Sequence, residues 1–492
     1  MIGLDGAPPA LLFRWARRGL LPNIAGLMAK GAYGPLRSTL PFSTCPAWTS
    51  SITGVDIEKH GIYDFFLRAD LRKKRIVFAN SRARRARAIW ELLDEVDRST
   101  VVLNLPVTYP PEEVNGAMVS GFLTPSMKSD FTYPKGLKSE LLEMGYRIDI
   151  GNTLLDMVLL FEKDPLGFLR AVSRLVKGRL RAAEYLMKSF DWDLFIVVFV
   201  ALDRVNHLFW KYIDPKHKDF DRRMAKALLP HIMKCYSDVD RAVGELVRLA
   251  GPETDILIYS DHGFKALNRF MFVNNLLRAK GLLSLREGGV KISRLMPTHD
   301  LYMSMRQRIP LTKAIHTLLP SPVKRKIGYL MRPSSEMLSF FDIDPDSTMA
   351  YQLGQLIHFN ERLSADELLT IVRAVLGALE EVYDQAMIRG LIRKLPHGAT
   401  TQLLIVLDNE GDIAPKHLIP ADGRLFQDYG PTNVPSLMWC GDHSLYGTLV
   451  MAGPHVKPIG RLEGGKIMDM APTALSLLGL DIPPYMDGVP LT

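Results

Sequence analysis

Cysteine is scarce in this chain of 492 residues, which holds only three. Cys45, Cys235 and Cys440 are too few for a disulfide framework, and none of them lies in a CxxC pair. The chain therefore lacks the features of a small secreted scaffold, and we expect a reduced, intracellular compartment.

Long hydrophobic runs are also absent. The longest, Phe195–Leu202, is far shorter than the roughly 20 residues that a membrane-spanning helix needs. Residues 1–22 carry three arginines where a signal peptide would have an apolar core. We therefore predict a soluble, cytoplasmic protein without a transmembrane segment.

The remaining composition is that of a folded protein. Hydrophobic residues make up 47% of the chain and charged residues 23%, which argues against disorder, collagen and coiled coil. The length exceeds that of one small domain and allows a large core. We find no internal repeat and no low-complexity segment.

Charge is mildly positive overall, with a net value of +8, but it is uneven. Between Arg68 and Arg87 there are nine lysines or arginines and one acid, Asp70. Such a segment could bind an anion or a nucleic acid. No nucleic-acid-binding motif accompanies it, so we favour a solvated hairpin followed by the exposed face of a helix.

Five short apolar runs have the composition of buried β-strands, and helical patterns separate them. They cover residues 1–5, 100–106, 193–203, 254–263 and 447–454. The segment Arg82–Val96 predicts a helix, with Ser81 as its N-cap. Strands that alternate with helices predict an α/β fold with a largely parallel sheet.

The region 266–400 has a different pattern. It contains helical segments, of which Ala365–Tyr383 is the clearest, many prolines and no β-run of comparable strength. We predict that it is a cap inserted into a core made of residues 1–265 and 400–492. A smaller helical insertion is expected over about 125–190.

Three aspartates and three histidines lie at or next to the ends of these strand-like runs. Asp203 ends the third run and His207 follows four residues later, so one helical turn would place both on one face. Ligands gather at the carboxyl ends of parallel strands, so we expect the six residues to meet at one edge. Oxygen and imidazole ligands without thiolate suit zinc or manganese, and six are enough for two ions. The six are Asp5, Asp203, His207, Asp261, His262 and His443.

A hydroxyl-rich segment, residues 40–54, supplies candidate nucleophiles. A hydroxyl at a helix N-terminus would meet the partial positive charge there, and a bound cation would lower its pKa further. Pro46 fits a first helical turn, which places Thr44 or Cys45 at the cap. We expect His60, nearby, to have a structural role.

Several segments resemble the type I phosphodiesterase/nucleotide pyrophosphatase branch of the alkaline phosphatase superfamily. The resemblance covers 1–264 and 441–491, and NLPVTYPPEEVNGAMVSGFLTP (104–125) is similar to a prokaryotic subgroup of predicted phosphodiesterases or phosphatases. The segments are MIGLDG (1–6), STCPAWTSSITGVDIEKHGIYDF (43–65), ALDRVNHLFWKYIDP (201–215), YSDHGF (259–264), GDHSLYGTLVMAGP (441–454) and KIMDMAPTALSLLGLDIPPYMDGVPL (466–491).

The resemblance implies an alkaline-phosphatase-like α/β/α sandwich with two divalent ions, usually zinc, that hydrolyses small phosphate esters. Thr44 would attack phosphorus in line and form a covalent phospho-enzyme, and Ser43 is the alternative nucleophile. Arg204 is the candidate phosphate contact. One ion would take Asp203, His207 and His443; the other would take Asp5, Asp261, His262 and the Thr44 oxygen.

Departures from the family pattern leave alternatives open. Nucleotide pyrophosphatases carry an asparagine three residues after the nucleophile, where this chain has Ala47. A phosphomonoesterase, phosphonate hydrolase or phosphotransferase therefore stays an alternative, as does a catalytically silent anion-binding protein. Sulfatases place their modified residue in a CxPxR context, but residue 49 here is Thr. Family members carry more apolar residues before GLDG, so a natural start upstream is left open.

Overall fold

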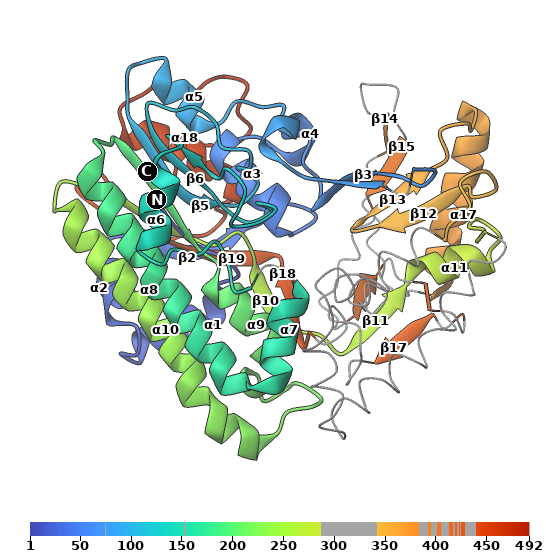
Figure 1. Cartoon of the computed structure of the whole chain (residues 1–492), viewed down its shortest axis with the longest axis horizontal. Coiled ribbons are helices and arrows are strands. Elements are labelled where there is room, and N and C mark those ends of the chain that lie inside the picture. The colour runs from blue at the N-terminus through green and yellow to red at the C-terminus, as the bar shows by residue number, and fades with distance from the viewer. Residues whose placement is uncertain are drawn as a thin grey trace, which may run out of the picture. The chain divides into compact units, whose positions relative to one another are not determined.

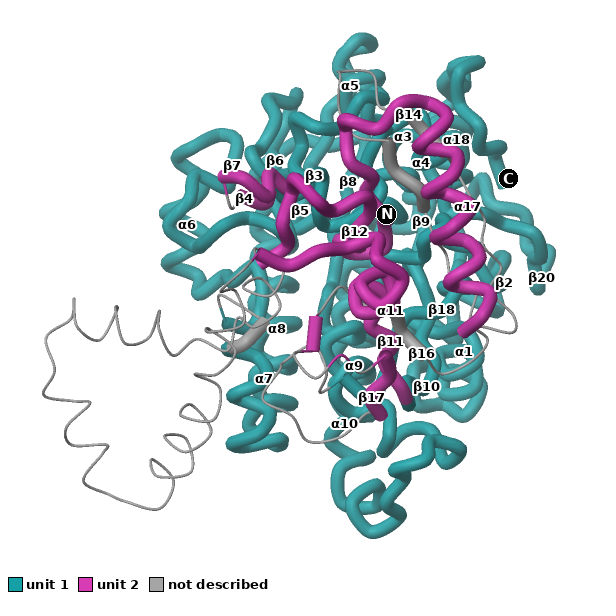
Figure 2. The backbone as a smooth tube through the Cα atoms, turned by 90° about the vertical axis from the view of Figure 1, so that its right-hand side faces the viewer, with its two compact units in different colours: residues 1–68, 77–268, 438–492 teal, residues 69–76, 269–437 magenta. Residues whose placement is uncertain are grey.

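The computed structural model describes residues 1–492 except 74, 152–153, 287–341, 383–391, 395–400, 405–412, 417–418, 421–422, 424, 429–438 and 492. The chain forms two compact units (Figure 2). Unit 1 comprises Met1–Arg68, Val77–Asn268 and Met438–Thr492. Unit 2 comprises Ala69–Ile76 and Arg269–Leu437. Much of the predicted cap region therefore lies outside the described residues.

A nine-stranded sheet forms the centre of unit 1, in the order β20-β2-β19-β9-β1-β8-β5-β6-β7. The central strands β9, β1, β8, β5 and β6 run parallel, whereas β19 pairs antiparallel with β2 and β9. This confirms the predicted α/β fold. The strands are β1 (Ile2–Leu4), β2 (Ala32–Arg37), β5 (Thr100–Leu105), β6 (Gly116–Ser120), β7 (Thr132–Tyr133), β8 (Leu194–Phe199), β9 (Ile256–Tyr259), β19 (Tyr446–Ala452) and β20 (Gly460–Arg461).

Helices cover both faces of this sheet, which makes unit 1 a three-layer sandwich. Figure 1 shows α2, α8 and α10 on one side and α3, α5 and α18 on the other. Every residue of β8 is buried, as expected for a strand with helices on both faces. The helices are α1 (Pro9–Arg17), α2 (Pro22–Lys30), α3 (Thr44–Thr53), α4 (Ile57–His60), α5 (Ile89–Asp94), α6 (Leu137–Glu143), α7 (Leu154–Lys163), α8 (Pro165–Ser189), α9 (Ala201–Ile213), α10 (Arg222–Ala250) and α18 (Met470–Leu477), with 3₁₀ turns η1 (Ser81–Ala83) and η3 (Ile467–Asp469).

The helix predicted over Arg82–Val96 is wrong in its first half. Ser81 does not cap it, because its hydroxyl donates to the carbonyl of Pro110 at 2.6 Å. Only the turn η1 forms there, and α5 begins at Ile89. The Glu91 carboxylate accepts the backbone N–H of Ala88 at 2.6 Å, which fixes this later start.

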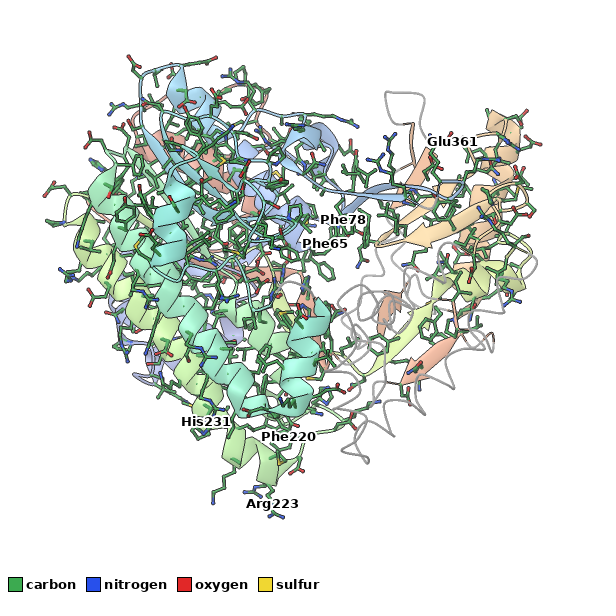
Figure 3. All side chains as sticks on the ribbon, in the orientation of Figure 1. Phe65, Phe78, Phe220, Arg223, His231 and Glu361 are labelled. Atoms are coloured by element: carbon green, nitrogen blue, oxygen red, sulfur yellow. The ribbon has the colours of Figure 1, made fainter. Side chains whose placement is uncertain are left out.

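The basic segment Arg68–Arg87 contains the predicted hairpin, made of β3 (Phe66–Asp70) and β4 (Arg75–Phe78). Phe78, labelled in Figure 3, is exposed at its end. Several of the cations are paired: Arg84 contacts Glu91 at 2.6 Å and Glu112 at 2.8 Å. Acidic residues from outside the segment Arg68–Arg87 thus offset part of its positive charge.

Helices α6, α7 and α8 occupy the predicted helical insertion. The described residues of unit 2 include short strands within 266–400, where the sequence shows no β-run of comparable strength. Strands β12 and β13 pair antiparallel and are fully buried, although each holds a polar residue, Gln352 or His358, that interrupts its apolar run. The predicted helix at 365–383 forms as α17. The elements are β11 (Arg269–Phe272), α11 (Val273–Ala279), β12 (Ala350–Leu353), β13 (Leu356–Phe359), α17 (Ala365–Val382), β14 (Ile392–Lys394), β15 (Thr401–Leu404), β16 (Ile413–Lys416) and β17 (Phe426–Asp428).

None of the described helices is long and apolar enough to cross a membrane.

Candidate active site

Five of the six candidate ligands follow the carboxyl ends of three neighbouring strands, β9, β1 and β8, and the sixth, His443, lies outside the nine-stranded sheet. Asp5 directly follows β1, and Asp261 and His262 follow β9 after one residue. Asp203 was predicted to end a strand, but β8 ends at Phe199 and Asp203 lies in the first turn of α9. His207 is one turn further along the same helix, as the four-residue spacing predicted.

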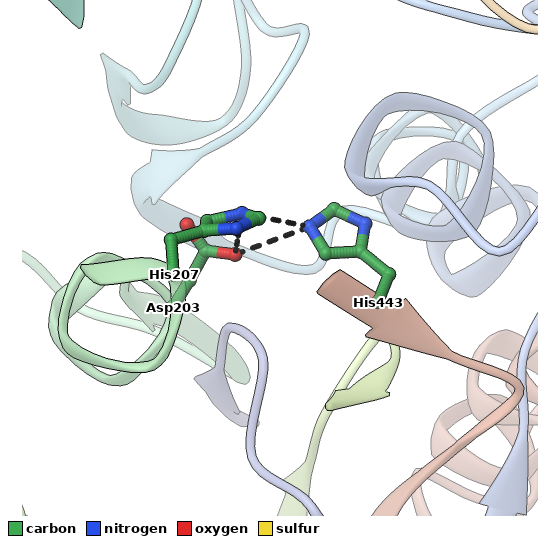
Figure 4. A group of neighbouring side chains, drawn as sticks. All are labelled: Asp203, His207 and His443. Atoms are coloured by element: carbon green, nitrogen blue, oxygen red, sulfur yellow. Dashed lines mark hydrogen bonds and ion pairs between the residues drawn. The ribbon is translucent and has the colours of Figure 1, made fainter. Parts of the chain in front are cut away.

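One group joins α9 to the strand β18 (Gly441–Ser444), which pairs with β10 (Gly263–Ala266) (Figure 4). His207 Nε2 and His443 Nε2 lie 3.3 Å and 3.4 Å from the same oxygen, Asp203 Oδ1. The two Nε2 atoms are 3.1 Å apart. The side chains of Asp203 and His207 are buried, and that of His443 is 13% exposed.

A second group lies beside the first and includes the candidate nucleophile. His262 Nε2 is 3.1 Å from Asp261 Oδ2 and 3.7 Å from Asp5 Oδ1. The Thr44 hydroxyl is 3.4 Å from the same Nε2. The His262 and His443 rings stack with centroids 3.5 Å apart, so the two groups are in contact.

Backbone carbonyls orient all three imidazoles. Nδ1 of His207 lies 2.9 Å from the carbonyl of Gly441, Nδ1 of His262 lies 3.1 Å from that of Gly263, and Nδ1 of His443 lies 3.3 Å from that of Phe42. A carbonyl oxygen can only accept, so each Nδ1 carries a proton, and a neutral imidazole then presents a lone pair on Nε2. Two such lone pairs 3.1 Å apart, on His207 and His443, repel each other unless a proton or a metal cation lies between them.

The three carboxylates are arranged in the same way, with one oxygen held and one oxygen free. The held oxygens accept from Arg204 Nη1 (Asp203), from Trp48 Nε1 at 3.3 Å (Asp5) and from the backbone N–H of Gly6 at 3.1 Å (Asp261). The other oxygens are buried and accept no hydrogen bond. Buried charge without a partner is costly, so these atoms, with the Nε2 lone pairs, fit bound cations.

Burial sets the electrostatics of the second group. Desolvation raises the pKa of Asp5 well above its usual value, and repulsion from Asp203 raises it further. Desolvation and the nearby Asp5 do the same to the pKa of Asp261. Burial holds the pKa of His262 well below its usual value. A divalent cation would reverse the penalty on the carboxylates and would not require the imidazole to take a proton.

Thr44 is the first residue of α3. The predicted cap, Thr44 or Cys45, is off by one or two residues, because the extended Ser43 (φ −130°, ψ 150°) is the N-cap and gives no side-chain cap bond. Pro46 lies in the first turn, as predicted, where its missing N–H costs nothing. The helix N-terminus places unpaired backbone N–H groups and partial positive charge beside the hydroxyl, which suits an anion.

Other predicted residues have their own contacts. His60 is buried between Ser50, whose hydroxyl is 2.9 Å from Nε2, and the backbone N–H of Ile62, which donates to Nδ1. This agrees with a structural role. Arg204 directs its guanidinium to carboxylates, so its expected contact with phosphate stays a prediction that this geometry does not favour.

Sequence reasoning missed the residues that orient the ligands. Trp48 lies inside the nucleophile segment, but nothing in the spacing ties its indole to Asp5. Asp149, which pairs with Arg204, lies in a loop 54 residues from Asp203 in sequence and carries no signal of its own. The carbonyls of Gly263, Gly441 and Phe42 are invisible in a sequence pattern.

Comparison with known proteins identifies the family. The model of the type I phosphodiesterase/nucleotide pyrophosphatase family matches residues 1–315. No curated protein matches the chain. The fold is similar to phosphonoacetate hydrolase from Sinorhizobium meliloti 1021 in complex with phosphonoacetate (TM-score 0.53, 12% identity, 97% of this chain and 95% of that chain). Its complex with phosphonoformate gives a TM-score of 0.50 at 13% identity over the same shares of both chains.

Human ectonucleotide pyrophosphatase/phosphodiesterase 5 has a TM-score of 0.46 at 12% identity, over 99% of this chain and 96% of that one.

The family match covers well over half of the sequence and includes five segments that the sequence singled out. The chain thus belongs to the type I phosphodiesterase/nucleotide pyrophosphatase family, and it is an enzyme that hydrolyses phosphoric esters.

Proposed function

We propose that the enzyme cleaves small-molecule phosphodiesters with Thr44 as nucleophile and two divalent ions bound by the two groups described above. The observation that carries this proposal is the set of unpartnered carboxylate oxygens and imidazole Nε2 atoms that face one another beside the Thr44 hydroxyl. Three imidazoles and three carboxylates suit zinc, with manganese as the second choice. The scarcity of cysteine supports a cytoplasmic location.

In this mechanism the protein supplies a positioned nucleophile and a fixed charge environment. Bound divalent ions would favour the ionised hydroxyl and stabilise charge on the phosphoryl oxygens. Helix α3 holds Thr44 at its N-terminus, and the dipole of this helix favours negative charge at that end. The Thr44 oxygen loses its proton to solvent and attacks phosphorus, and the ester oxygen leaves and takes a proton from water. A second water molecule then hydrolyses the covalent phospho-enzyme and restores the Thr44 hydroxyl.

The second candidate substrate class for the same scaffold is a phosphomonoester or a phosphonate. Ala47 favours it, because this residue is fully buried in α3 and offers no amide where nucleotide pyrophosphatases have asparagine. The similar fold of phosphonoacetate hydrolase supplies a defined compound to assay. We also propose that the predicted cap, residues 266–400, selects the substrate. The boundary between the two compact units, at Asn268, supports the predicted start of this cap.

The test is hydrolysis of bis-p-nitrophenyl phosphate, p-nitrophenyl phosphate and phosphonoacetate by zinc-loaded enzyme and its Thr44→Ala variant. We expect the diester to react fastest and Thr44→Ala to lower kcat at least about 1000-fold, because the nucleophile is gone. Thr53→Ala, at the other end of α3, is the control and should keep kcat within a few fold.

A faster monoester or phosphonate would reassign the substrate and leave the nucleophile intact. If Thr44→Ala keeps wild-type kcat, the nucleophile assignment is wrong, and Ser43→Ala is the next variant. If zinc-loaded wild type cleaves none of the three compounds, the proposed substrate class fails.

A further inference from the structure

The guanidinium of Arg204 is held between two acids. Its Nε and Nη2 donate to Asp149 at 3.1 Å and 2.7 Å, which is a two-point contact, and its Nη1 donates to Asp203. Its Cζ lies over the ring of Phe122, 5.0 Å from the centroid. Both side chains of the Asp149–Arg204 pair are largely buried, with 16% and 10% exposure.

Asp149 is itself fixed by a second buried arginine. Arg179, on α8, is 1% exposed and donates to the carbonyls of Arg147 at 3.0 Å and Ile148 at 2.8 Å. Its other terminal nitrogen donates to the carbonyl of Val198 in β8 at 2.6 Å. The loop that delivers Asp149 is therefore tied to the strand that precedes Asp203.

This arrangement determines which oxygen of Asp203 is free. Arg204 occupies Oδ2, so Oδ1 is left to face the Nε2 atoms of His207 and His443. A lone carboxylate could rotate and share its oxygens differently. Asp149 prevents this, because it fixes the guanidinium in a planar, two-point contact.

For Arg204 to contact phosphate, its side chain would have to adopt a different conformation. The side chain would have to give up a buried two-point ion pair and move out from beside Phe122. Breaking such a pair leaves Asp149 as an unpaired, largely buried charge, which is strongly unfavourable. The contacts therefore favour a role toward Asp203 over a role toward substrate.

We propose that Asp149 and Arg204 form a positioning pair that orients Asp203 for the ion held with His207 and His443. This inference rests on the proposed two-ion function. It assigns the pair to one of the two ions, because the orienting donors of Asp5 and Asp261 are Trp48 and the backbone of Gly6.

The experiment is zinc titration of chelator-treated full-length protein by calorimetry, with wild type, Asp149→Asn and Asp193→Asn compared. Asp193 pairs with Arg98 at 2.5 Å on the surface and provides the matched control. In Asp149→Asn we expect one of two zinc sites to weaken about 10- to 100-fold, the usual effect of losing an orienting partner, and the other to keep its affinity. The control should retain both affinities.

Kinetics separate positioning from substrate contact. With saturating zinc, a positioning role predicts that Arg204→Lys weakens the same zinc site as Asp149→Asn and lowers kcat with little change in KM. A phosphate contact predicts a raised KM with both zinc affinities unchanged, which would overturn the proposal. Arg204→Lys keeps the charge but loses the two-point contact, so it also serves if Asp149→Asn fails to fold, as judged by circular dichroism.

The outcomes for the two proposals are distinct. Wild type that binds no zinc would contradict the two-ion function itself. Wild type with two zinc sites, together with a folded Asp149→Asn that retains both affinities, would contradict the positioning pair alone.

Discussion

Trp48 links the helix that carries Thr44 to the carboxylate of Asp5. Its indole N–H donates to Asp5 Oδ2 at 3.3 Å, and its ring packs beside Gly3 of β1, where an added Cβ would lie 2.4 Å from the ring. The ring also lies 5.3 Å from that of Tyr259. One side chain thus fixes the free oxygen of Asp5 and the height of α3 above the sheet.

Replacing Trp48 with Phe tests this link at a single residue. The ring is largely kept but the donor is lost, so Asp5 can turn its oxygens, and we expect zinc affinity at the Asp5 group to fall about 10-fold with a matching loss of kcat at limiting zinc. Trp90→Phe is the control, because its indole N–H also donates to a carboxylate, Glu112, at 2.7 Å, but away from the ligand groups. Equal zinc affinity in Trp48→Phe and Trp90→Phe would contradict the role.

At the level of elements, β18 delivers His443 by packing closely on α9. The backbone N–H of Cys440 donates to the carbonyl of His207 at 2.8 Å, and His207 returns the contact through Nδ1 to the carbonyl of Gly441. Gly441 permits this approach, since a Cβ there would lie 2.4 Å from the carbonyl oxygen of Asn206 and 2.8 Å from Cβ of Trp210.

Gly441→Ala is therefore expected to push β18 away from α9. We predict a loss of about 1–3 kcal/mol in the free energy of unfolding, as for other overpacked sites, and a fall in kcat of at least about 10-fold because His443 moves. Gly26→Ala is the matched control: it lies in α2 with open space around its Cβ position, and alanine favours a helix. Urea unfolding and steady-state kinetics measure both effects, and wild-type values for Gly441→Ala would show that β18 does not depend on this contact.

The elements that the sequence predicted well are those with strong local signals. The run before Asp261 forms β9 and the run before Asp5 forms β1. The position of the two aspartates at the carboxyl ends of these strands therefore followed from apolar patterning. The first half of the helix at 82–96 fails for a non-local reason, because the Ser81 hydroxyl bonds to Pro110. The pairing of Asp149 with Arg204 is equally non-local and had no sequence signal.

At the scale of the whole chain, unit 1 is assembled from three separate segments, and each contributes to the site. Asp5 and Thr44 come from the first segment, the residues of α9 and those after β9 from the second, and His443 from the third. The second group thus joins the first segment to the second, and the pair Asp203–His443 joins the second to the third. Bound ions would therefore cross-link segments that are distant in sequence, and this stabilisation would be lost on chelation.

Tryptophan fluorescence reports this effect selectively, because all six tryptophans lie in unit 1 and none lies in 269–437. Trp439 even contacts His207, with ring centroids 3.8 Å apart. Zinc at about 1000 times its Kd would stabilise unit 1 by about 4 kcal/mol. We therefore expect a chelator to lower the fluorescence-detected Tm by at least about 5 °C, and restored zinc to reverse the change.

The matched control is the double variant Asp5→Asn with Asp203→Asn, which removes one carboxylate from each group. Its Tm should no longer respond to chelator or zinc, because the neutral amides cannot replace the free carboxylate oxygens. A wild-type Tm that ignores the chelator would mean that no ion joins the three segments. An undiminished response in the double variant would place the stabilising ion elsewhere in unit 1, and the two groups would then be sites of hydrogen bonding among buried acids and imidazoles.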